Sequence, residues 1–186
     1  MEKIGIFCSA SEEIDPEFFE ATRRLGAWMG KERKTLVYGG ANLGLMECIA
    51  RATKECGGKL VGVVPAILEE NGRASSLPDR IIPTRNLSDR KDCILEESDI
   101  LVALPGGVGT LDEVFHVIAA ASIGYHHKKV IFYNVAGFYN SLLAVLEEMK
   151  QKNFMRHPLC NYYAVANTFS ELINLLKQPN LTDNND

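Results

Sequence analysis

The chain has 186 residues, of which 46% are hydrophobic and 24% charged, the composition of an ordinary soluble globular protein with a full hydrophobic core. Its formal net charge of −4 provides no basic footprint for DNA or RNA, so we expect no nucleic-acid partner. The first residues, MEKIGIFCSAS, hold too short an apolar run for a signal peptide, and no apolar stretch approaches membrane-spanning length, so we expect no membrane partner.

Short β-rich runs alternate along the chain with amphipathic stretches of helical period, which predicts a parallel sheet with helices on both faces. In chain order, the expected strands are Lys3–Ser9, Thr35–Tyr38, Lys59–Val64, Asp79–Pro83, Ile100–Leu104, Val130–Asn134 and a short Tyr162–Val165. The expected helices are one that opens at Asp15-Pro16 and those over Leu43–Cys56, Leu87–Glu97, Thr110–Gly124, Phe138–Lys152 and Phe169–Lys177. The predicted fold class is a doubly wound, Rossmann-like α/β sheet.

No internal repeat and no linker divides the chain, so we expect residues 1–178 to form one domain and the polar residues 179–186 to form a disordered tail. The five cysteines are odd in number and lack CxxC spacing, which predicts reduced thiols and a cytoplasmic location. They form no recognisable ligand set with the four histidines, so we expect no metal site.

Two glycine-rich loops each follow an expected strand and precede an expected helix, at the strand ends where α/β sheets bind ligands. The first, YGGANLGLME, contains Gly39, Gly40 and Gly44, but Ala41 stands where a dinucleotide fingerprint needs glycine. The second, PGGVGT, lacks the lysine of a triphosphate-binding loop. Either loop alone is equally well explained as a tight turn with glycines for packing. Two such loops at one sheet edge predict a shared site of monophosphate size.

Thr110 suits the N-cap of the helix after the second loop, which places Glu113 in the first helical turn. An acid in that position stabilises a helix by roughly 0.3–1 kcal/mol, which is a sufficient explanation of Asp112. The same explanation suits Glu113 less well, because a carboxylate beside a bound phosphate repels it. If the ligand is a nucleoside monophosphate, the carboxylate of Glu113 can face the ribose instead.

The segment NLSDRKDCILEE, residues 86–97, supplies positive charge. On a helix, Lys91 falls within the apolar stripe and Arg90 lies next to its edge. Spacing alone favours a surface ion-pair cluster with Asp89 and Asp92. An Arg-Lys pair at a buried edge facing two glycine loops would instead clamp a phosphate or stabilise a departing base. The apolar stripe consists of Leu87, Ile94 and Leu95.

The helix expected within residues 111–125 is apolar on too many sides for a single core. Three consecutive alanines, Ala119–Ala121, would let another helix approach closely. The sequence therefore predicts a homodimer that buries this helix. Its apolar residues are Leu111, Val114, Phe115, Val117, Ile118 and Ile123.

The pattern PGGxGTxxE, which ends here at Glu113, together with the upstream Asp89-Arg90-Lys91, resembles the signature of the Lonely Guy (LOG) family, once labelled lysine decarboxylases. The likeness runs from GIFCSAS through YGGANLGLM to GFYNSLL. Members are cytokinin riboside 5′-monophosphate phosphoribohydrolases on a nucleotide-binding domain. The resemblance implies hydrolysis of the N-glycosidic bond of a cytokinin or purine nucleoside 5′-monophosphate, such as AMP, to free base and ribose 5-phosphate. It implies no cofactor.

Carried over by motif position, the implied catalytic pair is Arg90 and Glu113. The carboxylate would stabilise the oxocarbenium-like charge left on the ribose, and would orient or deprotonate the attacking water. The resemblance also implies a dimeric or larger assembly. The implied substrate-binding residues are Gly39, Gly40, Gly44, Lys91, Gly106, Gly107, Val108, Gly109, Thr110 and Asp112.

A rival interpretation is a non-catalytic carrier of a nucleotide or cofactor, because a fold alone does not settle function. Such a carrier needs the glycine loops but has no use for a carboxylate at the ribose. Several positions depart from the usual family pattern and could line a base pocket, so the preferred base stays open between a prenylated adenine and a plain purine. The departures are Ser9, Ala41, Glu47 and Ala119–Ala121.

Overall fold

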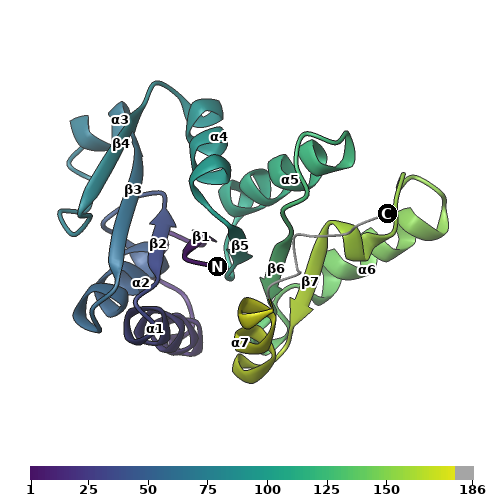
Figure 1. The fold of residues 1–186 in the computed structure, drawn as a ribbon, viewed down its shortest axis with the longest axis horizontal. Helices are drawn as coiled ribbons and strands as arrows, with labels where there is room; N and C mark the ends of the chain where they lie inside the picture. Colours follow the sequence, from purple (N-terminus) through teal and green to yellow (C-terminus); the bar gives the residue numbers. More distant parts are fainter. Residues whose placement is uncertain (179–186) are drawn as a thin grey trace.

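The computed structural model describes residues 1–178, in which one parallel seven-stranded sheet lies between two layers of helices (Figure 1). The predicted Rossmann-like α/β class is confirmed, whereas the predicted tail, residues 179–186, lies outside the described residues. The strands are β1 (Lys3–Phe7), β2 (Thr35–Tyr38), β3 (Lys59–Pro65), β4 (Arg80–Thr84), β5 (Ile100–Ala103), β6 (Val130–Tyr133) and β7 (Tyr163–Ala166). The helices are α1 (Pro16–Lys31), α2 (Gly44–Glu55), α3 (Ala66–Glu70), α4 (Leu87–Glu97), α5 (Val108–Ser122), α6 (Asn140–Gln151) and α7 (Phe169–Lys177), with 3-10 turns η1 (Val135–Gly137) and η2 (Leu159–Asn161).

The strand order β4-β3-β2-β1-β5-β6-β7 makes the chain change direction between β1 and β5. Loops that leave two such neighbouring strands diverge, which opens a crevice at the carboxyl ends of the strands. Pairing of Phe7 with Ala103 brings the ends of β1 and β5 side by side. The backbone N–H of Ser9 donates to the carbonyl of Pro105 at 3.2 Å, and the carbonyl of Ser9 accepts from the N–H of Leu45 at 3.0 Å. Both glycine loops therefore meet at this crevice.

Each face of the sheet packs against its own apolar layer, because strands of a parallel sheet are covered on both sides. Helices α1, α2 and α7 cover one face, through side chains such as Leu25, Ile49 and Leu172. Helices α4 and α5 cover the other face, through Ile94 and Val117, as the two sides of the ribbon in Figure 1 show. The two basic residues of α4 and the acids of α5 consequently belong to the same layer.

The start of α5 differs from the prediction in a way that matters for the site. The helix begins at Val108 with Gly107 as its N-cap, so the prediction that Thr110 caps it is wrong. Asp112 and Glu113 therefore lie beyond the first turn, where compensation of the helix dipole has largely faded. A different partner must explain each of these acids. The unpredicted α3 has only five residues, too few to display an apolar period.

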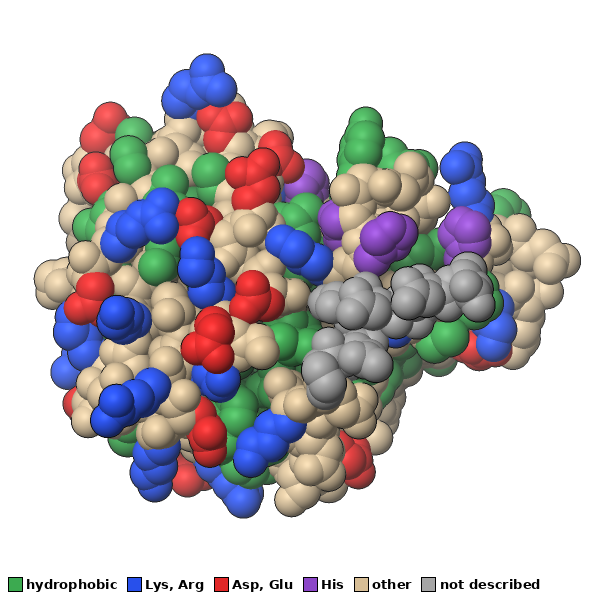
Figure 2. All heavy atoms as spheres, in the orientation of Figure 1, with side chains coloured by type: hydrophobic (Ala, Val, Ile, Leu, Met, Phe, Trp, Pro, Cys, Tyr) green, Lys and Arg blue, Asp and Glu red, His purple; other side chains and the backbone are tan. Residues whose placement is uncertain are grey.

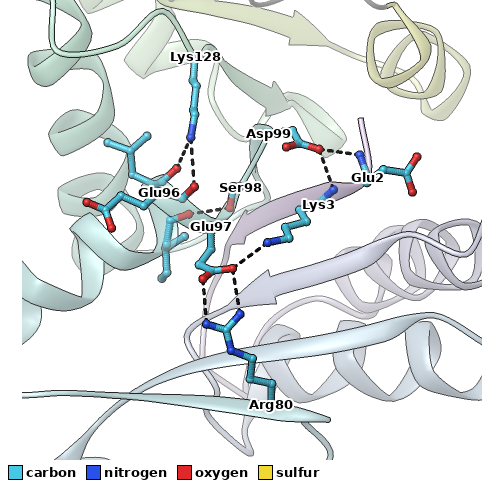
Figure 3. A network of polar contacts seen from close by, with 10 residues as sticks. Glu2, Lys3, Arg80, Glu96, Glu97, Ser98, Asp99 and Lys128 are labelled. Atoms are coloured by element: carbon cyan, nitrogen blue, oxygen red, sulfur yellow. Dashed lines mark hydrogen bonds and ion pairs between the residues drawn. The ribbon is translucent and has the colours of Figure 1, made fainter.

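Polar contacts at the amino-terminal edge of the sheet hold the far end of α4 in place (Figure 3). The carboxylate of Glu97 lies 3.0 Å from Nζ of Lys3 and 3.0 Å from Nη2 of Arg80. The hydrogen bond from Lys3, helped by Arg80, lowers the pKa of Glu97. Lys128 donates to the carbonyl of Leu95 at 2.6 Å, which satisfies one of the last carbonyls of the helix. This network positions the helix that carries the basic pair.

The five cysteines are all free thiols. Within residues 1–178, no group of three His, Cys, Asp or Glu side chains is placed to hold a metal ion. None of the helices in this part of the chain is long and apolar enough to cross a membrane.

Candidate functional site

A cavity of about 330 Å³ lies at the carboxyl ends of β1 and β5, where the strand order reverses. Its walls come from the turn after β1, from α2 and α4, and from the start of α5, which are far apart in the sequence. Small-molecule sites on this kind of sheet occupy the same place. The lining residues are Cys8, Ser9, Ala10, Met46, Leu87, Arg90, Lys91, Gly107, Gly109, Thr110, Asp112 and Glu113.

The second glycine loop presents bare backbone to this cavity. A Cβ added at Gly107 or Gly109 would meet no atom within 4 Å, so both glycines leave open space beside the start of α5. The first N–H groups of a helix have no partner inside it, and with the helix dipole they attract an anion. Gly106 instead packs closely, because a Cβ there would overlap Oγ1 of the buried Thr110. Val108 is 86% exposed and does not line the cavity.

Arg90 of α4 and Glu113 of α5 form a buried ion pair in the cavity wall. Nη2 of Arg90 lies 3.2 Å from Oε1 of Glu113, and the side chains are only 12% and 6% exposed. Nε of Arg90 is buried and has no hydrogen-bond partner among residues 1–178. A buried donor left unpaired costs about 1–3 kcal/mol, so this atom favours a ligand that can accept from it.

The carboxyl group of Glu113 titrates close to neutral pH. Burial raises its pKa from 4.5 to about 7; Arg90 opposes this shift, and the negative charge of Asp112 adds to it. An acid or base works best when its pKa is near the working pH. A buried carboxyl with a raised pKa and a charged partner in a cleft is typical of a functional site.

Lys91 reaches the same cavity and has its own partner. Its Nζ lies 2.9 Å from each carboxylate oxygen of Asp112, which explains this acid better than the helix dipole does. Two of the three donors of the ammonium group are thereby used, and one is left for an incoming anion. The surface cluster with Asp89 and Asp92 is not formed, so that interpretation of the spacing was wrong. Those two acids pair with Arg85 and His116 instead.

The glycines of the first loop, Gly39, Gly40 and Gly44, do not line the cavity. A Cβ on Gly39 would overlap Nη2 of Arg90, so only glycine leaves room for the guanidinium group in this position. Gly44 has a φ of +56°, and a Cβ there would lie 2.5 Å from the backbone of Ala10. Gly40 is packed in the same way against a side chain of β3. The loop therefore positions Arg90 and the start of α2.

Several residues that complete the cavity were not singled out from the sequence. Leu87 was expected in the apolar stripe of α4, but it is 58% exposed and lines the cavity together with Met46. No local pattern distinguishes these two residues from core residues of an amphipathic helix. Cys8 is a buried thiol whose pKa is raised by burial, so it stays protonated. Among the positions that depart from the family pattern, Ser9 lines the cavity, as expected for a turn at this sheet edge.

Comparison with known sequences identifies relatives along nearly the whole chain. The model of a family described as "Possible lysine decarboxylase" matches residues 46–176. A cytokinin riboside 5′-monophosphate phosphoribohydrolase of Arabidopsis thaliana is 31% identical, over 94% of this chain and 77% of its own length. A probable enzyme of the same name from Oryza sativa subsp. japonica is 34% identical, over 95% of this chain and 72% of its own.

Comparison with solved structures identifies the same fold in other proteins. A molybdenum cofactor binding protein of the bacterium Rippkaea orientalis superposes with a TM-score of 0.71 at 24% identity, over 95% of each chain. The molybdenum cofactor carrier protein of Chlamydomonas reinhardtii gives a TM-score of 0.73 at 23% identity, over 95% of this chain and 96% of that one. At this level of identity, the likeness shows a common fold and says nothing about the ligand.

Proposed function

The chain belongs to the LOG family, and from this premise we propose that it hydrolyses the N-glycosidic bond of a nucleoside 5′-monophosphate to free base and ribose 5-phosphate. The proposed substrates are cytokinin riboside or purine monophosphates, AMP among them. The observation that carries the proposal is the buried pair of Arg90 and Glu113 beside the exposed backbone at the start of α5. The five free cysteines suit the reducing cytoplasm, which we propose as its location.

In this proposal, the 5′-phosphate binds at the start of α5. The free N–H groups of its first turn and the remaining donor of Lys91 supply the hydrogen bonds, and Asp112 holds Lys91 in place. The ribose then lies over Glu113, and the base extends toward the apolar side chains of Met46 and Leu87. The buried Nε of Arg90 donates to the bound substrate.

Cleavage breaks the bond between C1′ and the base nitrogen, and the bonding electrons leave with the base. The ribose gains oxocarbenium-like positive charge, which the fixed carboxylate of Glu113 stabilises. Water adds to C1′ and gives a proton to the same carboxylate. That proton passes on to the departed base, so one water molecule is divided between the sugar and the base. The positive charge of Arg90 balances negative charge on the leaving base.

The pH dependence of the rate tests the role of Glu113. We expect kcat/KM for AMP to rise with pH through a pKa of about 7 and then level off, because only the ionised carboxylate can stabilise the cation and accept a proton. Asp112→Asn should move this limb to lower pH, because it removes a negative charge that raises the pKa of Glu113 and releases Lys91. If the pH dependence came from titration of the substrate phosphate instead, the rise in kcat/KM would occur at the same pH in the wild type and in Asp112→Asn.

The function itself is tested with a panel of nucleoside 5′-monophosphates, in which the free base is followed by chromatography. The panel contains AMP, GMP, the pyrimidine monophosphates and an N6-prenylated AMP. We expect base and ribose 5-phosphate in equal amounts from at least one purine member, and much slower release from the matching nucleoside, which lacks the phosphate. Binding of AMP without release of base from any member would contradict the proposal.

That contrary result would support a carrier of a nucleotide or cofactor, the rival on the same fold. A carrier requires a site for the ligand's anionic group, which the start of α5 provides. It gains nothing from a buried carboxyl with a pKa of about 7 beside an arginine. Burying such a group lowers the stability of the fold. An enzyme has a use for the group and a carrier has none, so the buried carboxyl favours the enzyme.

We also propose that the protein is a homodimer joined through α5. Phe115 on this helix is exposed, as are Met149 and Phe154 from α6 and the segment after it. Phe115, Met149 and Phe154 line one apolar cavity, and a contiguous apolar group marks an interaction surface. Three of the predicted interface residues belong instead to the protomer's own core, namely Val114, Val117 and Ile118.

Phe115→Asp should therefore weaken the dimer by at least about tenfold, because it buries an unpaired charge in the interface. Sedimentation at several protein concentrations measures the dissociation constant directly. Ile67→Asp is the matched control, since Ile67 is an exposed apolar residue on α3, away from this surface. A wild-type protein that sediments as a monomer at micromolar concentration would refute the dimer.

A further inference from the structure

A second cavity, of about 530 Å³, lies at the amino-terminal edge of the sheet, on the side opposite to the proposed active site. The end of α5, the turn that leads into β6, and the segment between α6 and β7 form its walls. It shares no lining residue with the cavity at Arg90 and Glu113. The proposed hydrolysis therefore leaves this cavity without a role.

The charged side chains that line this second cavity are all basic. Lys129 and Arg156 bring two positive charges, and no aspartate or glutamate lines the cavity, although acids outnumber Lys and Arg by 24 to 20 in the whole chain. Neither of these cations is paired within residues 1–178, whereas the nearby Lys150 and Lys152 both have glutamate partners. Histidines also gather over the part of the surface formed by α5, β6 and β7 (Figure 2). Three of them line the cavity, namely His126, His127 and His157.

A metal ion does not suit this lining, despite the histidines. Nδ1 of His126 already accepts a hydrogen bond from the backbone N–H of Lys128 at 3.1 Å. No three His, Cys, Asp or Glu side chains in the described part of the chain are placed to share a metal ion. Two uncompensated positive charges would also repel a cation. The same charges attract an anion, and the guanidinium group of Arg156 can hold an oxyanion with two parallel hydrogen bonds.

The size and the remaining lining of the cavity favour an anion that carries an organic group. A volume of about 530 Å³ lies within the range of small-molecule sites and would be mostly empty around a bare phosphate ion. Ile123 and the buried Tyr162 add apolar surface to the wall. The hydroxyl of Tyr162 has no hydrogen-bond partner among residues 1–178, so a polar group near it would be stabilised.

We propose that this cavity binds a small organic phosphate, with the phosphate oxygens on Lys129 and Arg156 and the organic group against Ile123 and Tyr162. It is a second ligand site, separate from the site of hydrolysis and independent of it. The proposal stands whether or not the protein releases bases from nucleotides, because the two cavities lie at opposite edges of the sheet.

The test titrates full-length protein, labelled with ¹³C at its histidine rings, with phenyl phosphate, inorganic phosphate and phenol. We expect phenyl phosphate to shift the ring signals of His126, His127 and His157 saturably, and inorganic phosphate to bind more weakly. His116, which is paired with Asp92 and does not line the cavity, is the internal reference. Phenol lacks the anion and should cause no saturable shift.

Matched variants connect the response to the two cations. Lys129→Gln/Arg156→Gln should weaken phenyl phosphate binding by at least about tenfold, because two charge-assisted contacts are lost. Lys150→Gln/Lys152→Gln removes the same charge from the carboxyl-terminal end of α6 and should leave the affinity unchanged. Thermal unfolding of each variant verifies that the fold is intact. The proposal is overturned if phenyl phosphate gives no saturable shift in the wild type, if inorganic phosphate binds as tightly, or if the Lys129/Arg156 variant retains wild-type affinity.

Discussion

Replacing Glu113 with glutamine will lower the release of base from a nucleoside 5′-monophosphate by about a thousandfold, the size of effect seen when one preorganised electrostatic group is removed from an active site. The substitution keeps the shape of the buried side chain and removes its negative charge. Without that charge, the cation on the ribose and the attacking water lose the buried carboxylate that the proposal assigns to them. Initial rates with the best substrate of the panel measure the loss, and calorimetry should show that AMP still binds.

The controls separate loss of chemistry from loss of structure. Glu96→Gln removes a carboxylate from an exposed position on α4 and should leave the rate unchanged. Glu113→Ala should be at least as slow as Glu113→Gln, since it also lacks the charge. A Glu113→Gln enzyme with more than about a tenth of the wild-type rate would mean that the carboxylate is not the stabilising group, because its loss would then cost less than about 1.4 kcal/mol.

Gly39→Ala should reduce the rate by about a hundredfold, although Gly39 does not line the cavity, because small displacements of a catalytic group have effects of this size. The added Cβ would overlap Nη2 of Arg90. That atom is the tip of a flexible side chain, so the clash moves the guanidinium group and leaves the backbone in place. Thermal unfolding should therefore change little while kcat/KM falls.

A double-mutant cycle tests whether Gly39 acts through Arg90. If it does, Gly39→Ala/Arg90→Ala will have the activity of Arg90→Ala alone, within about twofold, because the alanine at position 39 has nothing left to displace. Losses that multiply in the double variant would show that Gly39 acts by another route. The same cycle distinguishes a positioning glycine from one that contacts the substrate, as the family signature implies for this loop.

The ion pairs Arg90–Glu113 and Lys91–Asp112 show which parts of the site can be predicted from the sequence. Spacing on a helix placed Lys91 within the apolar stripe and Arg90 next to its edge, since that depends on period alone, and both side chains are mostly buried. It did not identify their partners, and the nearer acids Asp89 and Asp92 were the obvious choice. The partners come from α5, which packs on the same face of the sheet as α4. Desolvation in that layer also raises the pKa of Glu113, an effect that no local pattern records.

By itself, the amino-acid sequence determined the α/β class, the two glycine loops and the family signature, because strand and helix periods and short motifs are properties of neighbouring residues. Only the tertiary structure decided that Arg90 faces Glu113, that Gly39 makes room for this arginine, and that Leu87 lines a cavity. The strand order and the packing of α4 beside α5 bring these residues together across long stretches of chain. The second, basic cavity was likewise invisible in the sequence, since its walls come from two separate segments, residues 121–129 and 156–162.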